Sequence, residues 1–149
     1  MRAVLQRVNT AQVDVEGTTT GTIAAGLVVL LGIHRQDNET DINWLVDKMH
    51  HLRIFDDDQG QMNLSLTDVQ GELLVVSQFT LYGDCRKGRR PSWNNAAPPD
   101  QARRLYDLFI TACQQRGTTT QAGQFQAHMQ VTLTNSGPVT ILLDSHKTF

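Results

Sequence analysis

The chain has 149 residues, and its 13 lysines and arginines against 15 aspartates and glutamates give a formal net charge of −2. A chain of this length can bury a full hydrophobic core without disulfides or metal, and its two cysteines are too few for a disulfide framework. The longest apolar run is far shorter than the roughly 18 residues of a membrane span, and charges at Arg2 and Arg7 interrupt any hydrophobic signal region. We therefore expect one cytoplasmic, globular domain over residues 1–149, with no membrane partner.

The first third of the chain predicts strands. Two valine-rich segments, 3–8 and 12–15, are typical of short strands, and the Gly- and Thr-rich stretch 17–21 supplies a turn after them. Residues 23–33 are strongly apolar and interrupted by two glycines, which is typical of a strand buried on both faces.

Two later segments show helical periodicity. The first presents an apolar stripe made of Ile42, Leu45, Val46, Met49 and Leu52, and Thr40 or Asp41 can cap its start. The second presents a stripe made of Ala102, Leu105, Tyr106, Phe109 and Cys113. Pro98-Pro99-Asp100 marks its beginning and Gly117 its end.

The remaining segments predict further strands. Residues 73–81 form a core strand, and 125–133 alternate apolar and polar residues as a half-buried strand requires. Residues 139–143 follow across a turn at 135–138. Strands outnumber helices without a regular βα alternation, so we expect a mixed, β-rich α/β fold with two helices covering the sheet.

Few side chains are obvious candidates for catalysis. Ser77 and Thr80 follow an apolar strand and could present a hydroxyl group, but the Gly-x-Ser-x-Gly elbow is absent. A nucleophilic hydroxyl also needs a base within hydrogen-bond reach, and the sequence identifies none. The five histidines show no zinc-type spacing with one another or with cysteine. We therefore expect no bound metal.

One loop concentrates positive charge. Arg86, Lys87, Arg89 and Arg90 place four of the 13 basic residues within five positions. Such a patch can bind phosphates even on a slightly acidic protein. A solvated loop without a nucleic-acid partner explains the same residues equally well.

Several segments together resemble the D-aminoacyl-tRNA deacylase family. They are MRAVLQRV at 1–8, LRIF at 52–55, MNLS at 62–65, SQFTLY at 77–82, DCRKGRRPS at 84–92 and GPVT at 137–140. Each is weak alone, but their order over nearly the full chain is specific. The resemblance implies a cytoplasmic homodimer with a layered β/β/α, barrel-like sheet. It also implies hydrolysis of D-aminoacyl-tRNA, and of glycyl-tRNA mischarged on tRNA-Ala, without a cofactor.

The resemblance also assigns roles to individual residues. It implies that Gly137-Pro138 is a cis-peptide motif inserted from one subunit into the pocket of the other, and that Arg7 braces this motif. The backbone N–H groups of Phe79 and Thr80 would stabilise the reacting ester. The other positions that match the substrate pocket are Ser77, Gln78, Ala102, Phe125 and Met129. The basic residues of the loop, Arg86, Lys87, Arg89 and Arg90, would contact the tRNA, although subunit contacts or ion pairs are alternatives.

The implied mechanism suits a site with few catalytic side chains. An aminoacyl ester is already reactive, so positioning and stabilisation of the oxyanion by backbone N–H groups can suffice. In the family proposal the terminal ribose 2′-hydroxyl of the tRNA helps to activate water, and Thr80 is not an essential nucleophile. Carbonyl oxygens of the Gly-Pro unit would hold the substrate's α-amino group and leave no space for an L side chain, so D-amino acids and glycine pass.

Four positions depart from the family pattern. Ser136 precedes Gly-Pro where the family usually has Asp, Gln126 and His128 stand where Gly and an acidic residue are common, and Trp93 replaces Phe. These changes leave the rate and the tRNA preference open. Two other functions also stay open: a non-catalytic RNA-binding module that uses the basic loop, and a hydrolase with Thr80 as covalent nucleophile.

Overall fold

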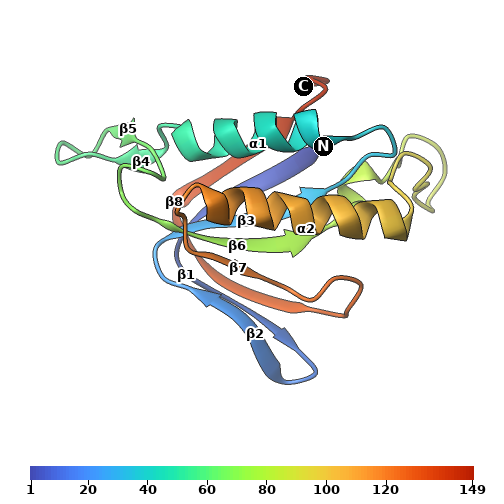
Figure 1. Cartoon of the computed structure of the whole chain (residues 1–149), viewed down its shortest axis with the longest axis horizontal. Coiled ribbons are helices and arrows are strands. Elements are labelled where there is room, and N and C mark those ends of the chain that lie inside the picture. Colours follow the sequence, from blue (N-terminus) through green and yellow to red (C-terminus); the bar gives the residue numbers. More distant parts are fainter.

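The computed structural model describes all residues from 1 to 149. Two helices lie on one side of a strongly curved mixed sheet (Figure 1). In chain order the elements are β1 (Arg2–Val15), β2 (Thr18–Ile23), β3 (Gly26–Gly32), α1 (Glu39–His51), β4 (Phe55–Asp56), β5 (Met62–Leu64), β6 (Glu72–Ser77), a 3-10 helix (Phe79–Tyr82), α2 (Pro99–Gln115), β7 (Thr120–Ala122) and β8 (Gln130–Asp144). Neither α-helix combines the length and the apolar character that crossing a bilayer would need.

Strand β1 organises the sheet. Along one edge it pairs antiparallel with β8 over nearly its full length, and along the other it pairs first with β3 and then with β2. Strand β3 continues the sheet by pairing parallel with β6, which in turn pairs parallel with β7. The expected mixed α/β architecture, with a barrel-like sheet and two covering helices, is thereby confirmed.

Both faces of the central strands are buried. On the helix side, Leu27 and Leu73 belong to a core cluster of 21 residues that also includes Phe109 of α2. On the concave side, Val28 and Leu74 belong to a second cluster of 7 residues. Side chains alternate between the two faces of a strand, so β3 and β6 supply apolar residues to both clusters. The prediction that the 23–33 region is buried on both faces is confirmed for β3.

Both helices bury the predicted apolar stripes. The N-cap of the first helix, however, is a different residue from those expected. Asn38 is the N-cap of α1: its side-chain oxygen accepts from the backbone N–H of Thr40 at 2.8 Å, while the Asp41 carboxylate accepts from the N–H of Asn38 at 2.9 Å. This reciprocal pair is a capping box. The expected caps, Thr40 and Asp41, therefore lie inside the helix, and helix α2 begins at Pro99 as the proline signal predicts.

Three strand boundaries differ from the expectations. Segments 3–8 and 12–15 are parts of the single strand β1, because β8 pairs with both of them. The apolar segment 23–33 bends at residues 24–25 and is divided between β2 and β3. The strand expected over 73–81 ends at Ser77, since the chain turns there into the 3-10 helix.

The C-terminal region departs most from the expectations. Residues 125–129 lie outside any strand, although Phe125 and Met129 are half-buried and the polar residues between them are exposed. Periodicity therefore found the half-buried side chains of 125–129 but not the backbone conformation, and Val131, on the face expected to be apolar and buried, is 37% exposed. The expected turn at 135–138 is instead an irregularity within β8, which runs unbroken from Gln130 to Asp144.

Candidate functional site

A cavity of about 670 Å³ opens where β6 ends, between the start of α2 and the segment 125–131. Its lining includes six of the residues expected to bind substrate: Ser77, Gln78, Phe79, Ala102, Phe125 and Met129. It also includes residues that the sequence did not indicate, among them Trp93, Ala97 and Val131. Nothing local marks these three, because they reach the cavity only through the packing of distant segments.

The chain turns sharply at one wall of this cavity. Gln78 donates its backbone N–H to the carbonyl of Leu31 at 2.7 Å, which continues the parallel pairing of β3 with β6 for one more residue. The backbone bonds of the following turn start with the N–H of Leu81, which donates to the carbonyl of Gln78 at 3.2 Å. The N–H groups of Phe79 and Thr80 precede this bond, at the start of the helix, where backbone donors have no helical partner. Both N–H groups are therefore free to bind a ligand oxygen.

The side chains of Phe79 and Thr80 are exposed, and neither is an acid or a base. Phe79 is 57% exposed, and its ring packs edge-on against Trp93 with the ring centres 5.1 Å apart. The Thr80 hydroxyl accepts a hydrogen bond from the Gln78 side-chain amide. Thr80 itself does not line the cavity, and the only titratable side chain that does is that of the exposed His128. An amide cannot act as a base, so the structure offers no group beside Thr80 that would activate its hydroxyl.

The opposite wall is a packed aromatic surface. The ring of Phe125 lies 5.7 Å from that of Tyr106, which is buried and donates its hydroxyl to the carbonyl of Val75 at 2.8 Å. Burial raises the pKa of Tyr106, so this hydroxyl stays protonated and serves as a donor. Next to Phe125, Gln126 adopts a φ of +64°, a left-handed conformation that costs roughly 1 kcal/mol for a residue with a side chain. This position is one of the departures from the family pattern, where glycine is common.

Gly137 and Pro138 lie in a bulge of β8, on another part of the sheet. Asn135 pairs with Val8 and Thr140 pairs with Gln6, so residues 136–139 all lie opposite Arg7. The peptide bond between Gly137 and Pro138 is cis, and both residues are exposed. Within the bulge, the side-chain oxygen of Asn135 accepts from the backbone N–H of Val139 at 2.9 Å.

The buried side chain of Arg7, on β1, holds this bulge in place through a hydrogen bond. Its side chain is 8% exposed, and its Nε donates to the carbonyl of Ser136 at 3.1 Å. Another guanidinium nitrogen donates to the carbonyl of Ile54 at 2.8 Å and to the carboxylate of Asp56 at 3.0 Å. The bulge is thus tied to the β4 region by an arginine from β1. None of Arg7, Gly137 and Pro138 lines the cavity of its own chain, so the expected site residues fall into two separate groups.

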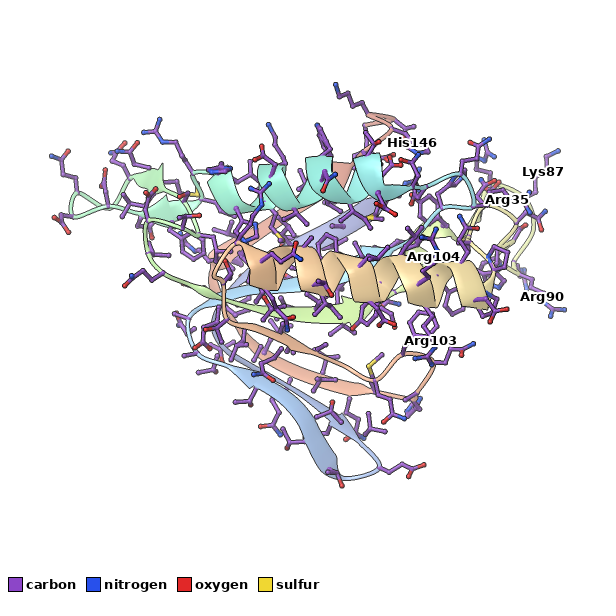
Figure 2. All side chains as sticks on the ribbon, in the orientation of Figure 1. Arg35, Lys87, Arg90, Arg103, Arg104 and His146 are labelled. Atoms are coloured by element: carbon purple, nitrogen blue, oxygen red, sulfur yellow. The ribbon has the colours of Figure 1, made fainter.

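The basic loop is exposed at the end of the molecule where α2 begins (Figure 2). Arg86 forms a two-pronged ion pair with Asp84, with distances of 2.8 and 2.6 Å. The guanidinium and backbone N–H of Arg86 lower the pKa of Asp84 to about 2. The side chains of Lys87, Arg89 and Arg90 form no ion pair with the chain's own carboxylates. Three of the four expected phosphate contacts therefore keep an unneutralised charge.

One cluster has side chains of the type that bind metal. Atoms of His34, Asp37 and His146 that could be ligands lie within 4.8 Å of one another. One Asp37 oxygen accepts from the amino group of Met1 at 2.6 Å, and the other accepts from the backbone N–H of His34 at 2.6 Å. Nδ1 of His34 accepts from the backbone N–H of Gln36 at 3.2 Å. Hydrogen bonds and an ion pair thus account for this arrangement.

Comparisons with known proteins agree with one another. The sequence matches the family model described as D-Tyr-tRNA(Tyr) deacylase over residues 4–144. Proteins named D-aminoacyl-tRNA deacylase from Thermosipho africanus and Clostridioides difficile are 60% and 57% identical over 149 residues, each covering 100% of both chains.

Two solved structures share the fold. One, described as c-Myc DNA Unwinding Element Binding Protein, matches with a TM-score of 0.91 at 40% identity and covers 97% of this chain and 98% of that chain. The other, described as a probable eukaryotic D-amino acid tRNA deacylase, matches with a TM-score of 0.81 at 18% identity and covers 95% of this chain and 97% of that chain.

Proposed function

Because the chain belongs to the D-aminoacyl-tRNA deacylase family of hydrolases, we propose that it hydrolyses the ester bond of D-aminoacyl-tRNA in the cytoplasm and releases a free D-amino acid and tRNA. One structural observation supports this proposal at the level of individual residues. The cavity beside β6 is lined by Phe79, the backbone N–H groups of Phe79 and of the adjoining Thr80 are free, and no side chain of the cavity is arranged as an activated nucleophile. Such a site suits an ester that is reactive enough to need only positioning and charge stabilisation.

The reaction would proceed as follows. Water attacks the ester carbonyl and loses a proton, and the negative charge that develops on the carbonyl oxygen is stabilised by the N–H groups of Phe79 and Thr80. The bond between the acyl carbon and the ribose oxygen then breaks, and the ribose oxygen takes up a proton and leaves as a hydroxyl group. Removal of one such donor typically costs a factor of 10²–10³ in rate. The 2′-hydroxyl of the terminal ribose, which belongs to the substrate, helps to activate the water. Ser77 and Gln78 hold the reacting end, while Ala102, Phe125 and Met129 shape the space around it.

Chiral selection would come from a second copy of the chain. Gly137 and Pro138 are exposed and lie outside the cavity of their own chain, so a partner's cavity is the place where their carbonyl oxygens could meet a substrate amino group. There they would leave space for hydrogen but not for an L side chain, so D-aminoacyl and glycyl esters, including glycyl-tRNA mischarged on tRNA-Ala, would pass.

The outer surface of β8 supports a homodimer. This strand pairs only with β1, so its other edge has unpaired backbone groups. Leu142 on the same strand is 58% exposed. A second copy packed on this strand would cover apolar surface and bring the bulge of each copy toward its partner.

Positive charge at the end of the molecule would hold the nucleic acid. Lys87 and Arg90 extend from the basic loop at the end of the molecule where α2 begins (Figure 2), and acceptor phosphates would pass there. Arg89 belongs to the same loop, and Arg86 is already bound to Asp84. Phosphate contacts position a nucleic acid and weaken as salt rises.

The proposal is tested by measuring the release of amino acid from D-Tyr-tRNA, L-Tyr-tRNA and Gly-tRNA-Ala by the purified protein. We expect hydrolysis of the D-tyrosyl and glycyl esters and none of the L-tyrosyl ester above the uncatalysed rate. If the D-ester is stable at enzyme excess while the tRNA still binds, the chain is an RNA-binding module and not a deacylase. Equal rates on the D- and L-esters would contradict the chiral selection.

A further inference from the structure

We propose that Arg103 binds a phosphate next to the 3′ end of the substrate nucleic acid and so positions the ester in the cavity. This inference rests on the proposed deacylase function. It concerns a residue of α2 that lies outside the basic loop and outside the segments that carry the family resemblance.

Helix α2 places Arg103 next to two residues that line the cavity. Ala102, the preceding residue, lines the cavity. The guanidinium carbon of Arg103 lies 4.8 Å from the centre of the Phe125 ring, and Phe125 also lines this cavity. Figure 2 shows Arg103 extending from α2 on the side away from α1, whereas Arg104 extends toward α1.

Stacking fixes the guanidinium without using its donors. A cation over an aromatic face is held by the electrons of the ring, and the Phe125 ring is in turn packed against Tyr106. The N–H groups at the edge of the guanidinium plane remain available for an anion. Arginine binds phosphate through two parallel N–H···O bonds, and a guanidinium held in one orientation loses less conformational entropy when it does so.

Arg103 also lacks the neutralising carboxylate that three other arginines have. Arg104 lies 3.8 Å from the Glu39 carboxylate, Arg116 lies 3.0 Å from that of Asp47, and Arg86 lies 2.6 Å from that of Asp84. No carboxylate lies within 4.0 Å of Arg103. An unpaired arginine beside the cavity lining therefore presents its full charge to a bound ligand.

The chemistry of the substrate indicates which anion the Arg103 guanidinium binds. An aminoacyl ester has no carboxylate, and its α-amino group is cationic when protonated, so a guanidinium would repel the reacting end itself. The nearest anion is the phosphodiester on the other side of the terminal ribose. The carboxylate of the released amino acid has similar chemistry, and the test must separate these two sources.

Binding of two non-hydrolysable probes tests the proposal independently of catalysis. One is an acceptor-stem RNA whose 3′ end carries D-tyrosine through an amide, and the other is the same D-tyrosyl amide on adenosine, which has no phosphate. In Arg103→Gln we expect the RNA probe to bind about tenfold more weakly and the adenosine probe to bind within twofold of wild type. Arg103→Lys should recover part of the loss, since it keeps the charge but not the two-pronged geometry.

Arg104→Gln is the matched control, because it removes a neighbouring arginine that faces α1 and pairs with Glu39. It should bind both probes as wild type does. In Arg103→Gln the slope of log Kd against log salt for the RNA probe should fall by about 0.7, the value for one phosphate contact on a single strand.

Three results would overturn the proposal. Arg103→Gln could weaken the binding of both probes equally, or leave the binding of the RNA probe unchanged. The third is that free D-tyrosine inhibits deacylation by Arg103→Gln less than deacylation by wild type, while the binding of the RNA probe is unchanged. The last would assign the guanidinium to the product carboxylate. Wild type that binds both probes but does not hydrolyse D-Tyr-tRNA would contradict the deacylase function and leave the phosphate contact measurable.

Discussion

The cavity beside β6 and the bulge of β8 are built in opposite ways. The cavity is a space enclosed mainly by apolar side chains from several segments, with the free backbone N–H groups of Phe79 and Thr80 at the end of β6. The bulge is a projecting piece of backbone, fixed from within by hydrogen bonds from Arg7 and within Asn135–Val139, and its carbonyl groups are acceptors. The free N–H groups of one region are donors and the projecting carbonyl groups of the other are acceptors, yet the two regions do not meet within one chain.

The two regions would therefore bind different parts of one substrate. Donors at the cavity would stabilise a negatively charged oxygen, and acceptors on the bulge would recognise a positively charged nitrogen. In a reacting aminoacyl ester, the carbonyl oxygen that becomes negative and the cationic amino nitrogen are attached to adjacent carbon atoms. A site for this substrate therefore needs both regions together. Two copies of the chain satisfy this need if each inserts its bulge into the other's cavity.

The largest effect is expected from Gly137→Ala. Gly137 has a φ of +119°, and an added Cβ would lie 2.8 Å from the Val139 side chain and 3.0 Å from the Arg7 guanidinium. The bulge would have to move, and a displacement of about 1 Å at a reacting centre can cost 10²-fold. We expect deacylation of D-Tyr-tRNA to fall roughly 100-fold in a protein that remains folded by circular dichroism. Wild-type kinetics in this variant would remove the bulge from the site.

A smaller loss is expected from Arg7→Met. The substitution keeps an apolar stem but leaves the carbonyls of Ser136 and Ile54 without their donor, which costs about 1–3 kcal/mol where such groups are buried. We expect lower stability in urea unfolding and about tenfold slower deacylation. Asp56→Asn is the matched control. It removes only the half-exposed ion pair and should cost less than about 1 kcal/mol. An equal effect of both variants would show that Arg7 acts through Asp56 and not through the bulge.

A modest effect is expected from Thr80→Ala. If backbone N–H groups are the catalytic donors, the variant should retain at least about a tenth of the wild-type kcat, because its main chain is unchanged. A covalent nucleophile would instead be lost with its hydroxyl, and activity would vanish. Single-turnover rates on D-Tyr-tRNA separate the two outcomes. His128→Gln, on the exposed rim of the same cavity, serves as the control for unspecific changes.

The mildest effect is on stability and comes from outside both regions. Burial lowers the pKa of His50, whose ring nitrogens lie 2.7 Å from the carbonyl of Val46 and 2.9 Å from the hydroxyl of Thr118. Burial also lowers the pKa of His34. The unfolded chain then binds more protons than the folded one, so stability falls as pH falls below about 6.5.

Urea unfolding at pH 7.5 and 5.5 should show this loss, and His50→Gln should reduce it. The slope cannot exceed roughly 1.4 kcal/mol per pH unit for each histidine. An unfolding free energy that is flat between these two pH values would contradict the assignment.

Some features of this structure could be predicted from the sequence, and others could not. Apolar periodicity predicted both helices and the strand cores, since burial of one face leaves a repeating pattern. It misplaced the 3-10 helix at Phe79–Tyr82 and the bulge at 136–139, because both depend on pairing with β1 and β3, which are distant in the chain. Trp93 and Val131 reach the cavity through tertiary packing alone. The grouping of Ser77, Gln78 and Phe79 with Ala102, Phe125 and Met129 came from family resemblance and not from any local pattern.

The most direct test mixes two variants that each lack half of the site. Ala102→Phe fills the cavity and leaves the bulge intact, whereas Gly137→Ala disturbs the bulge and leaves the cavity intact. If each site combines a cavity with the partner's bulge, random mixing makes half of the dimers mixed, and each mixed dimer contains one intact site. The mixture should then show about one quarter of wild-type activity, although each variant alone is nearly inactive. Activity that stays at the level of the separate variants, in a sample shown by sedimentation to contain mixed dimers, would contradict the shared site.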